Sequence, residues 1–262
     1  MNKNSTNLRN TILNAFSIAI YVIMFDMISI VLPAYREEEN LVNILPRINK
    51  VMTDNSLDYE ILVVDTIEPI DNTRKVCEDN GAGYNPRRGG NNYGDAIRTG
   101  FADAKGEFLV IMDADGSHDP EKIADFYKII NEQNADLIIG SRYCKGGYTD
   151  NNFILRFMSW ALNFTYRVFF KLKVKDVSDS FRMYRSEQIK ALSLECDNFD
   201  IVEEILIKLN ISKKDYKIIE VPISFNKRAA GESKRKLLKF IFSYIKTISR
   251  LLKIKRKALK GG

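Results

Sequence analysis

Residues 108–115 read FLVIMDAD, an apolar run that ends in two aspartates, Asp113 and Asp115. A short continuous apolar run of this kind is typical of a strand buried on both faces of a sheet. Similar runs lie at residues 27–33, 60–65 and 135–140, and residues 37–52 carry apolar side chains at helical spacing. Alternating strands and helices predict an α/β fold with a Rossmann-like, mostly parallel central sheet and helices on both faces.

The composition is that of one sizeable domain rather than a small disulfide-stapled protein. The chain has 262 residues, 45% of them apolar, which is enough to bury a large core. Its three cysteines stand far apart, and His118 is the only histidine. We therefore expect no structural zinc site and a reducing compartment. We interpret His118 as a hydrogen-bonding residue of a loop rather than as a catalyst.

The charge is unevenly distributed along the chain. The net charge of +6 comes from 40 basic and 34 acidic residues. From Lys234 to the end there are eleven basic residues and no acidic one, so residues 1–233 carry a net charge of −5. Whatever anionic partner the charge implies should therefore meet the tail.

The basic tail also has the apolar spacing of an amphipathic helix. We expect residues 234–262 to lie as an interfacial helix on anionic lipid, since their bulky apolar surface is wide and their basic face has no acidic partners. The alternative is a helix packed on the domain with a solvated basic face. Nucleic acid is not the expected partner, because no aromatic stacking platform is interleaved with the basic residues.

The first 26 residues differ from the rest of the chain. Their apolar run, residues 12–25, is too short to cross a bilayer, which takes about 20 residues. Three interpretations stay open: an interfacial anchor or short membrane-embedded helix, an upstream extension before a start at Met27, and a cleaved signal peptide.

The ends of the predicted strands carry the residues of chemical interest. In parallel sheets, ligands bind outside the carboxyl ends of the strands. Asp113 and Asp115 follow a strand directly and can share one hard cation, Mg²⁺ or Mn²⁺, on a nucleotide diphosphate. Taken alone this pair is weak evidence, because aspartates also serve as solvated turn formers.

Five motifs, in order between residue 27 and about residue 250, make the chain resemble the family 2 glycosyltransferases. Within that family the resemblance is to the polyprenyl-phosphate (dolichyl-phosphate) mannosyl- and glucosyltransferases. The motifs are IVLPAYREEEN at 30–40, NYGDAIRTG at 92–100, MDADGSHDP at 112–120, GSRY at 140–143, and EVPISF at 220–225 followed by RAAGESK at 228–234.

The resemblance implies a GT-A fold that transfers a hexose, with inversion, from a nucleotide sugar to a lipid monophosphate. GDP-mannose is the first expectation for the donor and UDP-glucose the closest alternative. From another class, the alternative is a catalytically weak homologue that acts as a membrane-bound scaffold. A sugar nucleotidyltransferase is disfavoured, because no glycine-rich basic loop follows the first strand.

The resemblance also assigns roles to individual residues. The nucleotide sugar would contact Pro33, Tyr35, Glu37, Asp65, Asp113 and Ala114, and the metal would be held by Asp113 and Asp115 with Ser117 as a third contact. The acceptor phosphate would meet Arg142, Arg156, Ser159, Arg228 and Lys234. The residues expected to take part in catalysis are Asp115, Arg142, Arg228, Lys234 and Glu204, although Glu203 lies one register from Glu204.

The chemistry supports these roles. A lipid monophosphate is already mostly dianionic near pH 7, since its second pKa is about 6, and it needs little help from a general base. The harder tasks are to stabilise the departing nucleoside diphosphate and to bring two anionic phosphates together. A metal and cationic side chains serve both, and the planar fork of arginine suits phosphate well.

The chain departs from the family pattern in two places. The family's D-D-G-S-x-D-G-T is here Asp65-Thr66-Ile67-Glu68 and onward, which leaves the choice between GDP and UDP open. The family's T-S-G-F-R is here Ser178-Asp179-Ser180-Phe181-Arg182, with a glycine lost and a carboxylate added. This change is expected to alter the donor or acceptor fit near Arg182, with reduced activity as one outcome.

We thus expect three segments: an apolar extension or anchor at 1–26, a catalytic domain at 27–233 and a basic membrane-surface helix at 234–262. The expected location is the cytoplasmic face of a membrane, and the oligomeric state is left open.

Overall fold

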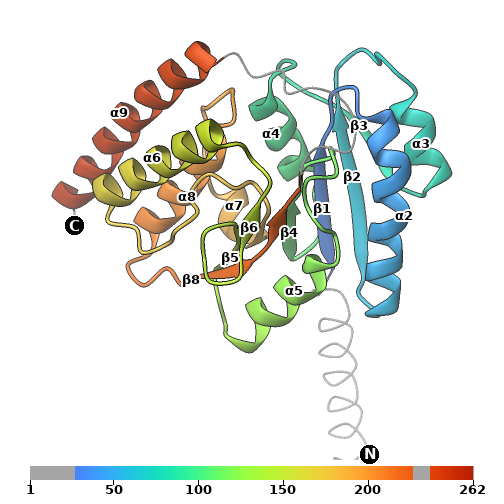
Figure 1. Cartoon of the computed structure of the whole chain (residues 1–262), viewed down its shortest axis with the longest axis horizontal. Helices are drawn as coiled ribbons and strands as arrows, with labels where there is room; N and C mark the ends of the chain where they lie inside the picture. Colours follow the sequence, from blue (N-terminus) through green and yellow to red (C-terminus); the bar gives the residue numbers. More distant parts are fainter. Residues whose placement is uncertain (1–26, 227–236, 262) are drawn as a thin grey trace, which may run out of the picture.

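In a computed structural model, which describes residues 27–226 and 237–261, the chain folds into alternating strands and helices (Figure 1). The strands are β1 (Ile28–Pro33), β2 (Tyr59–Asp65), β3 (Gly83–Pro86), β4 (Phe108–Ile111), β5 (Leu137–Ser141), β6 (Tyr148–Thr149), β7 (Arg182–Arg185), β8 (Ile218–Pro222) and β9 (Ser224–Phe225). The helices are α2 (Glu38–Asp54), α3 (Thr73–Asp79), α4 (Tyr93–Asp103), α5 (Lys122–Glu132), α6 (Phe153–Phe170), α7 (Ser186–Lys190), α8 (Ile201–Ser212) and α9 (Leu237–Gly261).

Seven strands form the central sheet, in the order β3-β2-β1-β4-β7-β5-β8. All neighbouring strands pair in parallel except β7, which runs antiparallel to both β4 and β5. The mostly parallel α/β sheet predicted from the apolar runs is therefore confirmed, and β7 is an addition to it. A separate two-stranded sheet joins β6 to β9.

Strand β1 lies between β2 and β4. Strands β2 and β3 are added on one side of β1, and β4 then begins the other side of the sheet. Ile28 of β1 pairs with both Tyr59 of β2 and Phe108 of β4, so the three strands run in register. The carboxyl ends of β1 and β4 are the point where the strand order reverses. In open α/β sheets this is where a ligand crevice forms.

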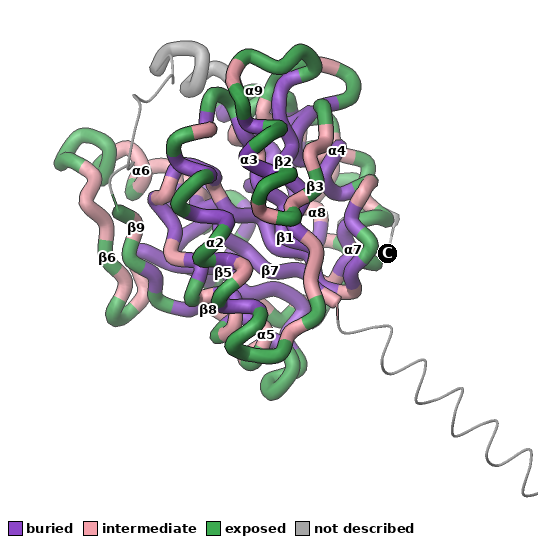
Figure 2. The backbone as a smooth tube through the Cα atoms, turned by 90° about the vertical axis from the view of Figure 1, so that its right-hand side faces the viewer, coloured by how far each residue is buried: buried purple, intermediate pink, exposed green. Residues whose placement is uncertain are grey.

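Side chains of β1 alternate between two apolar layers, as strand geometry requires. Ile28, Ile30 and Leu32 belong to a core shared with α2 and α5, whereas Val31 belongs to a second core with α4 and α8. Strands β1, β5 and β7 are buried at the centre, with most of the exposed surface on the surrounding helices and loops (Figure 2). The prediction of helices on both faces is confirmed.

Two glycines let α4 approach its neighbours closely. A Cβ at Gly100 would overlap the side chain of Val31 on β1, and one at Gly94 would overlap the backbone at Cys196. The Gly94 amide donates to the Asp197 carbonyl oxygen at 2.8 Å. These contacts explain why the 92–100 segment has glycine at both places, and they hold the start of α4 against the ligand crevice.

Helix α9 packs on the domain through one of its faces. Tyr244 and Leu251 are buried in the core that α6 and α8 share, and Thr247 is also buried. Lys246 and Lys253 are exposed. The amphipathic C-terminal helix predicted from the sequence thus forms. The residues of its inner face that the structure describes pack against the domain, which agrees with the alternative interpretation of a helix packed on the domain.

Two predicted segments lie outside the described residues: the extension at 1–26 and the motif that contains Arg228 and Lys234. Among the helices in the described part of the chain, none is both long enough and apolar enough to cross a bilayer.

Candidate active site

A cavity of about 340 Å³ opens at the carboxyl ends of β1 and β4. Six residues predicted to contact the nucleotide sugar or the metal line it together: Pro33, Tyr35, Glu37, Asp113, Ala114 and Asp115. The first three belong to the loop after β1 and the others to the loop after β4. Residues some 80 positions apart in the sequence therefore meet where the strand order reverses.

The loop after β1 is held by Glu37 at the start of α2. The Glu37 side chain is buried and accepts a hydrogen bond from Asn40 Nδ2 at 2.6 Å. Pro33 ends the strand, and Arg36 adopts a left-handed φ of 57° that turns the chain into the helix. Tyr35 remains 40% exposed beside the cavity, where its ring can meet a ligand.

The two aspartates after β4 are held in place by neighbours. Ser180 Oγ donates to Asp113 Oδ1 at 2.9 Å, and the Ser117 amide donates to Asp115 Oδ1 at 3.0 Å. Gly116 has a φ of 79°, a conformation that glycine adopts without strain, and it turns the chain between Asp115 and Ser117. The turn leaves both carboxylates on the wall of the cavity.

This donor set fits a hard cation. Mg²⁺ and Mn²⁺ take oxygen ligands, and Mg²⁺ is commonly held by one or two carboxylates plus substrate phosphates. The Ser117 hydroxyl is buried without a hydrogen-bond partner, although Ser117 itself does not line the cavity. Within residues 27–226 and 237–261, no cluster of three or more Asp, Glu, His or Cys side chains is placed to hold a metal. A cation here would rely on Asp113, Asp115 and oxygens brought by the ligand.

His118 serves the loop that carries the aspartates. Its Nδ1 accepts a hydrogen bond from the Asp113 amide at 3.1 Å, and its Nε2 lies 3.3 Å from Asp179 Oδ1. The ring is buried and stacks on Phe181, with centroids 5.0 Å apart. Both ring nitrogens thus face protein groups, which agrees with a positioning role and leaves neither nitrogen directed at the cavity.

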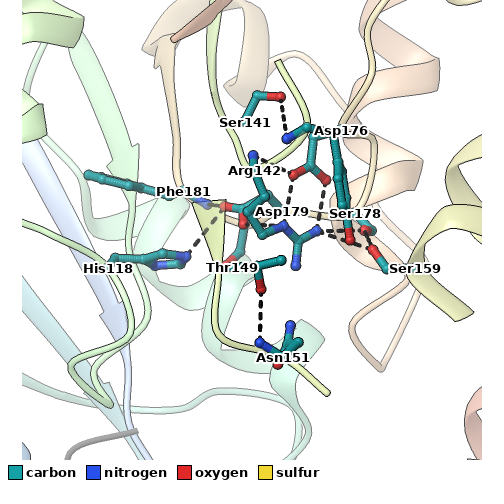
Figure 3. A network of polar contacts seen from close by, with 12 residues as sticks. His118, Ser141, Arg142, Thr149, Asn151, Ser159, Asp176, Ser178, Asp179 and Phe181 are labelled. Carbon is teal, nitrogen blue, oxygen red and sulfur yellow. Dashed lines mark hydrogen bonds and ion pairs between the residues drawn. The ribbon is translucent and has the colours of Figure 1, made fainter. Parts of the chain in front are cut away.

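Arg142 is the centre of a buried polar network (Figure 3). Its Nε and Nη2 donate to the two carboxylate oxygens of Asp176 at 2.8 and 2.7 Å, and Nε lies 3.2 Å from Asp179 Oδ2. Nη2 also donates to Ser178 Oγ at 2.9 Å and reaches Ser159 Oγ at 3.5 Å. Burial alone would lower the pKa of Arg142, but the two carboxylates raise it above its ordinary value.

This network changes the interpretation of Arg142. In the structure its guanidinium is engaged by carboxylates, and Arg142 does not line the cavity. Its predicted role as a phosphate ligand stays a prediction.

Asp65 does not line the cavity itself but contacts a residue that does. It is fully buried at the end of β2, and its Oδ2 accepts a hydrogen bond from Tyr84 at 3.3 Å. Burial raises the pKa of Asp65, with neighbouring Arg87 opposing the shift. The Asp65 carbonyl oxygen accepts from the amide of Arg87, a cavity-lining residue, so Asp65 can act on a ligand through Arg87.

Glu204, the carboxylate on α8 that is predicted to take part in catalysis, does not line the cavity, and neither does its neighbour Glu203. Glu204 is buried, accepts hydrogen bonds from the amides of Glu195 and Cys196, and pairs with Lys208 at 2.8 Å. Burial works against the ionised form of Glu204, but Lys208 and Cys196 lower its pKa. Glu203 is also fully buried, and burial raises its pKa to about 8. Glu204 also lies 3.3 Å from Arg250 of α9, so it links α8 to α9 in this structure.

The predicted acceptor residues in the described part of the chain lie on or beside α6. Arg156 is exposed on that helix. Ser159 is half-buried, and its hydroxyl lies 3.2 Å from Ser178 Oγ in the Arg142 network. The structure brings Ser159 and Arg142 together, and neither of them lines the cavity.

Sequence reasoning missed the other cavity residues, which are Ala34, Arg87, Asn91, Asn92, Tyr93, Asn198 and Phe199. Tyr93 and Phe199 stack at the wall, with ring centroids 4.4 Å apart. Tyr93 lies within the 92–100 motif, so a search of that motif for aromatic side chains could have found it. Arg87 follows the short edge strand β3, and no sequence motif marks it as a site residue.

Comparisons with known proteins place these observations in a family. Residues 29–192 match the family Glycosyl transferase family 2. The chain is 36% identical over 234 residues to the dolichol-phosphate mannosyltransferase of Pyrococcus furiosus, covering 86% of this chain and 64% of that protein's length. It is 31% identical over 214 residues to the undecaprenyl-phosphate mannosyltransferase of Micrococcus luteus, covering 78% of this chain and 85% of that one.

Solved structures show the fold. The glucosyl-3-phosphoglycerate synthase of Mycobacterium tuberculosis with Mn²⁺, UDP and glucosyl-3-phosphoglycerate superposes with a TM-score of 0.66 at 19% identity, over 87% of this chain and 79% of that chain. The same enzyme with Mg²⁺ and UDP also gives 0.66, at 18% identity and the same coverage. The predicted GT-A fold is confirmed.

Proposed function

The chain belongs to glycosyl transferase family 2, and from that membership we propose that it transfers a hexose from a nucleoside-diphosphate sugar to a polyprenyl monophosphate, with inversion at the anomeric carbon. One observation carries the proposal: Asp113 and Asp115 share a cavity with the loop after β1 at the reversal point of the sheet. The two relatives described above are mannosyltransferases named for polyprenyl-phosphate acceptors, and they support the acceptor class and mannose as the first expectation.

The cavity offers separate groups for the parts of the donor. Pro33, Tyr35 and Glu37 would contact the nucleoside, and Arg87 adds a cationic group on the same wall. Asp113 and Asp115, with Ser117 as a third contact, would hold Mg²⁺ or Mn²⁺, which when bound supplies positive charge to the departing diphosphate. Ser180 and the Ser117 amide keep the two carboxylates oriented for that task.

The acceptor needs positioning more than activation. A lipid monophosphate is largely dianionic near pH 7, so its oxygen can attack without a strong general base. Consistent with this, neither His118 nor Glu204 is directed at the cavity. We propose that Arg156, Ser159, Arg228 and Lys234 bring the acceptor phosphate to the donor, with Arg142 as the buried anchor of that side.

The lipid acceptor places the reaction at a membrane, and the proposed location is the cytoplasmic face with peripheral attachment. Transfer from UDP-glucose by the same chemistry is the alternative for the donor, since the 65–73 loop departs from the family pattern. A membrane-bound scaffold is the alternative for the whole function, because the added Asp179 enters the network beside the aspartates.

A donor panel tests the proposal. The purified chain, Mg²⁺ or Mn²⁺ and a short polyprenyl phosphate are mixed with radiolabelled GDP-mannose, UDP-glucose or other nucleotide sugars, and label in the lipid fraction is counted. We expect transfer from one donor, loss of transfer on metal chelation, and loss in Asp115→Ala. As a matched control, Asp197→Ala removes an exposed carboxylate and should keep full transfer. Absence of transfer from every donor, with intact lipid binding, would support the scaffold.

A further inference from the structure

One wall of the cavity is the turn before α8, residues 198–200, which we call the wall turn. Asn198 and Phe199 line the cavity, and Phe199 stacks on Tyr93, another residue of the lining, with ring centroids 4.4 Å apart. A turn of three residues has no core of its own, so its position is set by the neighbours that it contacts. A shift of the wall turn would change the shape of the cavity.

Asp200, the last residue of the wall turn, is held by α9. It occupies the N-cap position of α8, where an aspartate ordinarily accepts a hydrogen bond from an amide of its own helix. Its side chain makes no such cap bond to α8, all of which the structure describes. Asp200 Oδ2 instead accepts a hydrogen bond from Thr247 Oγ1 on α9, and both residues are buried. A side chain placed to cap α8 is thus used to hold α9.

A second contact with α9 lies just before the wall turn and runs through Glu204 of α8. The Glu204 carboxylate reaches back and accepts hydrogen bonds from the amides of Glu195 and Cys196 at 3.0 and 2.8 Å. Arg250 on α9 lies 3.3 Å from the same carboxylate, and its Nη1 donates to Glu195 Oε2 at 3.4 Å. Cys196 Sγ lies 3.4 Å from Thr247 Oγ1. Helix α9 therefore holds the chain both before the wall turn and at its end.

These contacts are polar but lie inside the interface between α8 and α9. Asp200, Cys196, Glu204 and Thr247 are buried, whereas the Arg250 side chain is 25% exposed. A buried carboxylate that loses a hydrogen bond is left with the cost of its desolvation uncompensated. A shift of α9 alone would break bonds of this kind where water does not replace them. The wall turn and α9 are therefore coupled through contiguous contacts.

We propose that Thr247 and Arg250 of α9 are positioning residues for the donor cavity, because they fix the wall turn that lines it. The inference rests on the proposed function, since it takes the cavity to bind the nucleoside diphosphate of the donor. It gives α9 a part in donor binding in addition to its packing on the domain. Because coupling between two sites is reciprocal, a nucleotide in the cavity should in turn hold α9 more firmly.

Hydrogen exchange of the ligand-free chain, measured by mass spectrometry, tests the coupling itself. Thr247→Val removes the hydroxyl and nearly keeps the shape of the side chain. We expect faster exchange in peptides that cover residues 195–200, with β1 and β2 unchanged, whereas general destabilisation would speed exchange in all of them. Thr247→Ser keeps the hydroxyl and should exchange like wild type. Thr165→Val is the matched control, because the Thr165 hydroxyl donates within its own helix, to the Ala161 carbonyl oxygen at 2.7 Å.

Calorimetric titration with GDP or UDP in the presence of Mn²⁺ tests the consequence for the cavity. Thr247→Val should raise the Kd of the nucleotide that wild type binds by about 5- to 20-fold, the lower part of the range for coupled sites. In the transfer assay the KM for the donor should rise while kcat is largely kept, because the wall turn acts on binding. In wild type, bound nucleotide should slow exchange at residues 244–251 of α9.

Several results would overturn the inference. They are unchanged exchange at residues 195–200 in Thr247→Val, a Kd equal to that of wild type, and a Kd increase that Thr247→Ser or Thr165→Val shares. Should Thr247→Val fail to fold, Arg250→Gln, at a partly exposed position, carries the same two expectations. Failure of the proposed function looks different: wild type would then bind neither nucleotide, and both proposals would fall. Transfer by wild type with an unchanged Kd in Thr247→Val would remove the inference alone.

Discussion

Replacing Asp179 with asparagine removes one negative charge from between Arg142 and His118 while keeping the shape of the side chain. The carboxylate is buried, with Oδ2 3.2 Å from Arg142 Nε and Oδ1 3.3 Å from His118 Nε2. Asp179 Oδ1 also accepts a hydrogen bond from the Phe181 amide at 2.9 Å, which an asparagine oxygen can still accept. The variant therefore isolates the charge.

The expected loss in the free energy of unfolding follows from what Arg142 retains. Breaking a buried ion pair costs about 3–5 kcal/mol when the partner charge is left alone. Here Arg142 keeps two hydrogen bonds to Asp176, so Asp179→Asn should cost only about 1.5–3 kcal/mol, the range for hydrogen bonds to charged groups. Asp176→Asn should cost more than Asp179→Asn, because Asp176 accepts two hydrogen bonds from the Arg142 guanidinium.

The cost should depend on pH in a defined direction. Burial opposes ionisation of Asp179, but Arg142 and His118 lower its pKa below the ordinary value. A carboxylate with a lowered pKa in the folded state stabilises the protein above its unfolded pKa, about 3.9, and loses that effect as pH falls through the folded pKa. The contribution of the Asp179 carboxylate to the difference between wild type and Asp179→Asn should thus shrink as the pH falls below about 4.

Urea unfolding followed by circular dichroism measures both effects, with the slope m checked for constancy. Asp197→Asn is the control, since that carboxylate is 62% exposed and should change stability by less than about 0.5 kcal/mol. The account of the network would be refuted by a cost below about 0.5 kcal/mol for Asp179→Asn. A cost larger than that of Asp176→Asn would also refute it.

Three further outcomes are expected. Gly100→Ala should lower stability by about 1–3 kcal/mol in a thermal melt, because the new methyl group overlaps Val31, and an unchanged Tm would contradict that packing. Since the pKa of Glu203 is raised to about 8, this group should make wild-type stability fall by up to about 1.4 kcal/mol per pH unit between about pH 5 and 8. In urea titrations, the stability of Glu203→Gln should not fall over this pH range. If the stability of the two proteins changed with pH in parallel, the raised pKa of Glu203 would be contradicted. In a thiol-reagent time course at pH 8, half-exposed Cys144 should react first, ahead of Cys77, whose pKa burial raises to about 12; faster labelling of a buried thiol would contradict the structure.

The apolar runs predicted β1, β2, β4 and β5 within a few residues, because strands buried on both faces need little else in their sequence. Strand β7 was missed for a physical reason: it reads RMYR and begins with Arg182, a residue normally found at the surface. Here Arg182 is fully buried because its guanidinium donates to backbone carbonyl oxygens, including that of Val202 at 2.9 Å. Such partners come from distant segments, and no local pattern shows them.

The candidate site was predictable where it follows strand ends and less so elsewhere. Asp113 and Asp115 were found because a carboxylate pair after a buried strand has a short local pattern. The partners of Arg142 could not be found in that way, since Asp176 lies 34 residues away and only the fold brings the two together. The sequence likewise shows that α6 is apolar, but which face of it points to solvent depends on tertiary contacts such as that of Asn163.

The central claim is inverting transfer of a hexose to a lipid monophosphate at the cavity that Asp113 and Asp115 line. Nuclear magnetic resonance of the lipid product, made with the donor that the panel selects, tests it most directly. We predict a hexosyl phosphate linkage whose anomeric configuration is opposite to that of the donor, absent when Asp115→Ala replaces wild type. A product with the donor's configuration, or sugar released to water without a lipid product, would contradict the account.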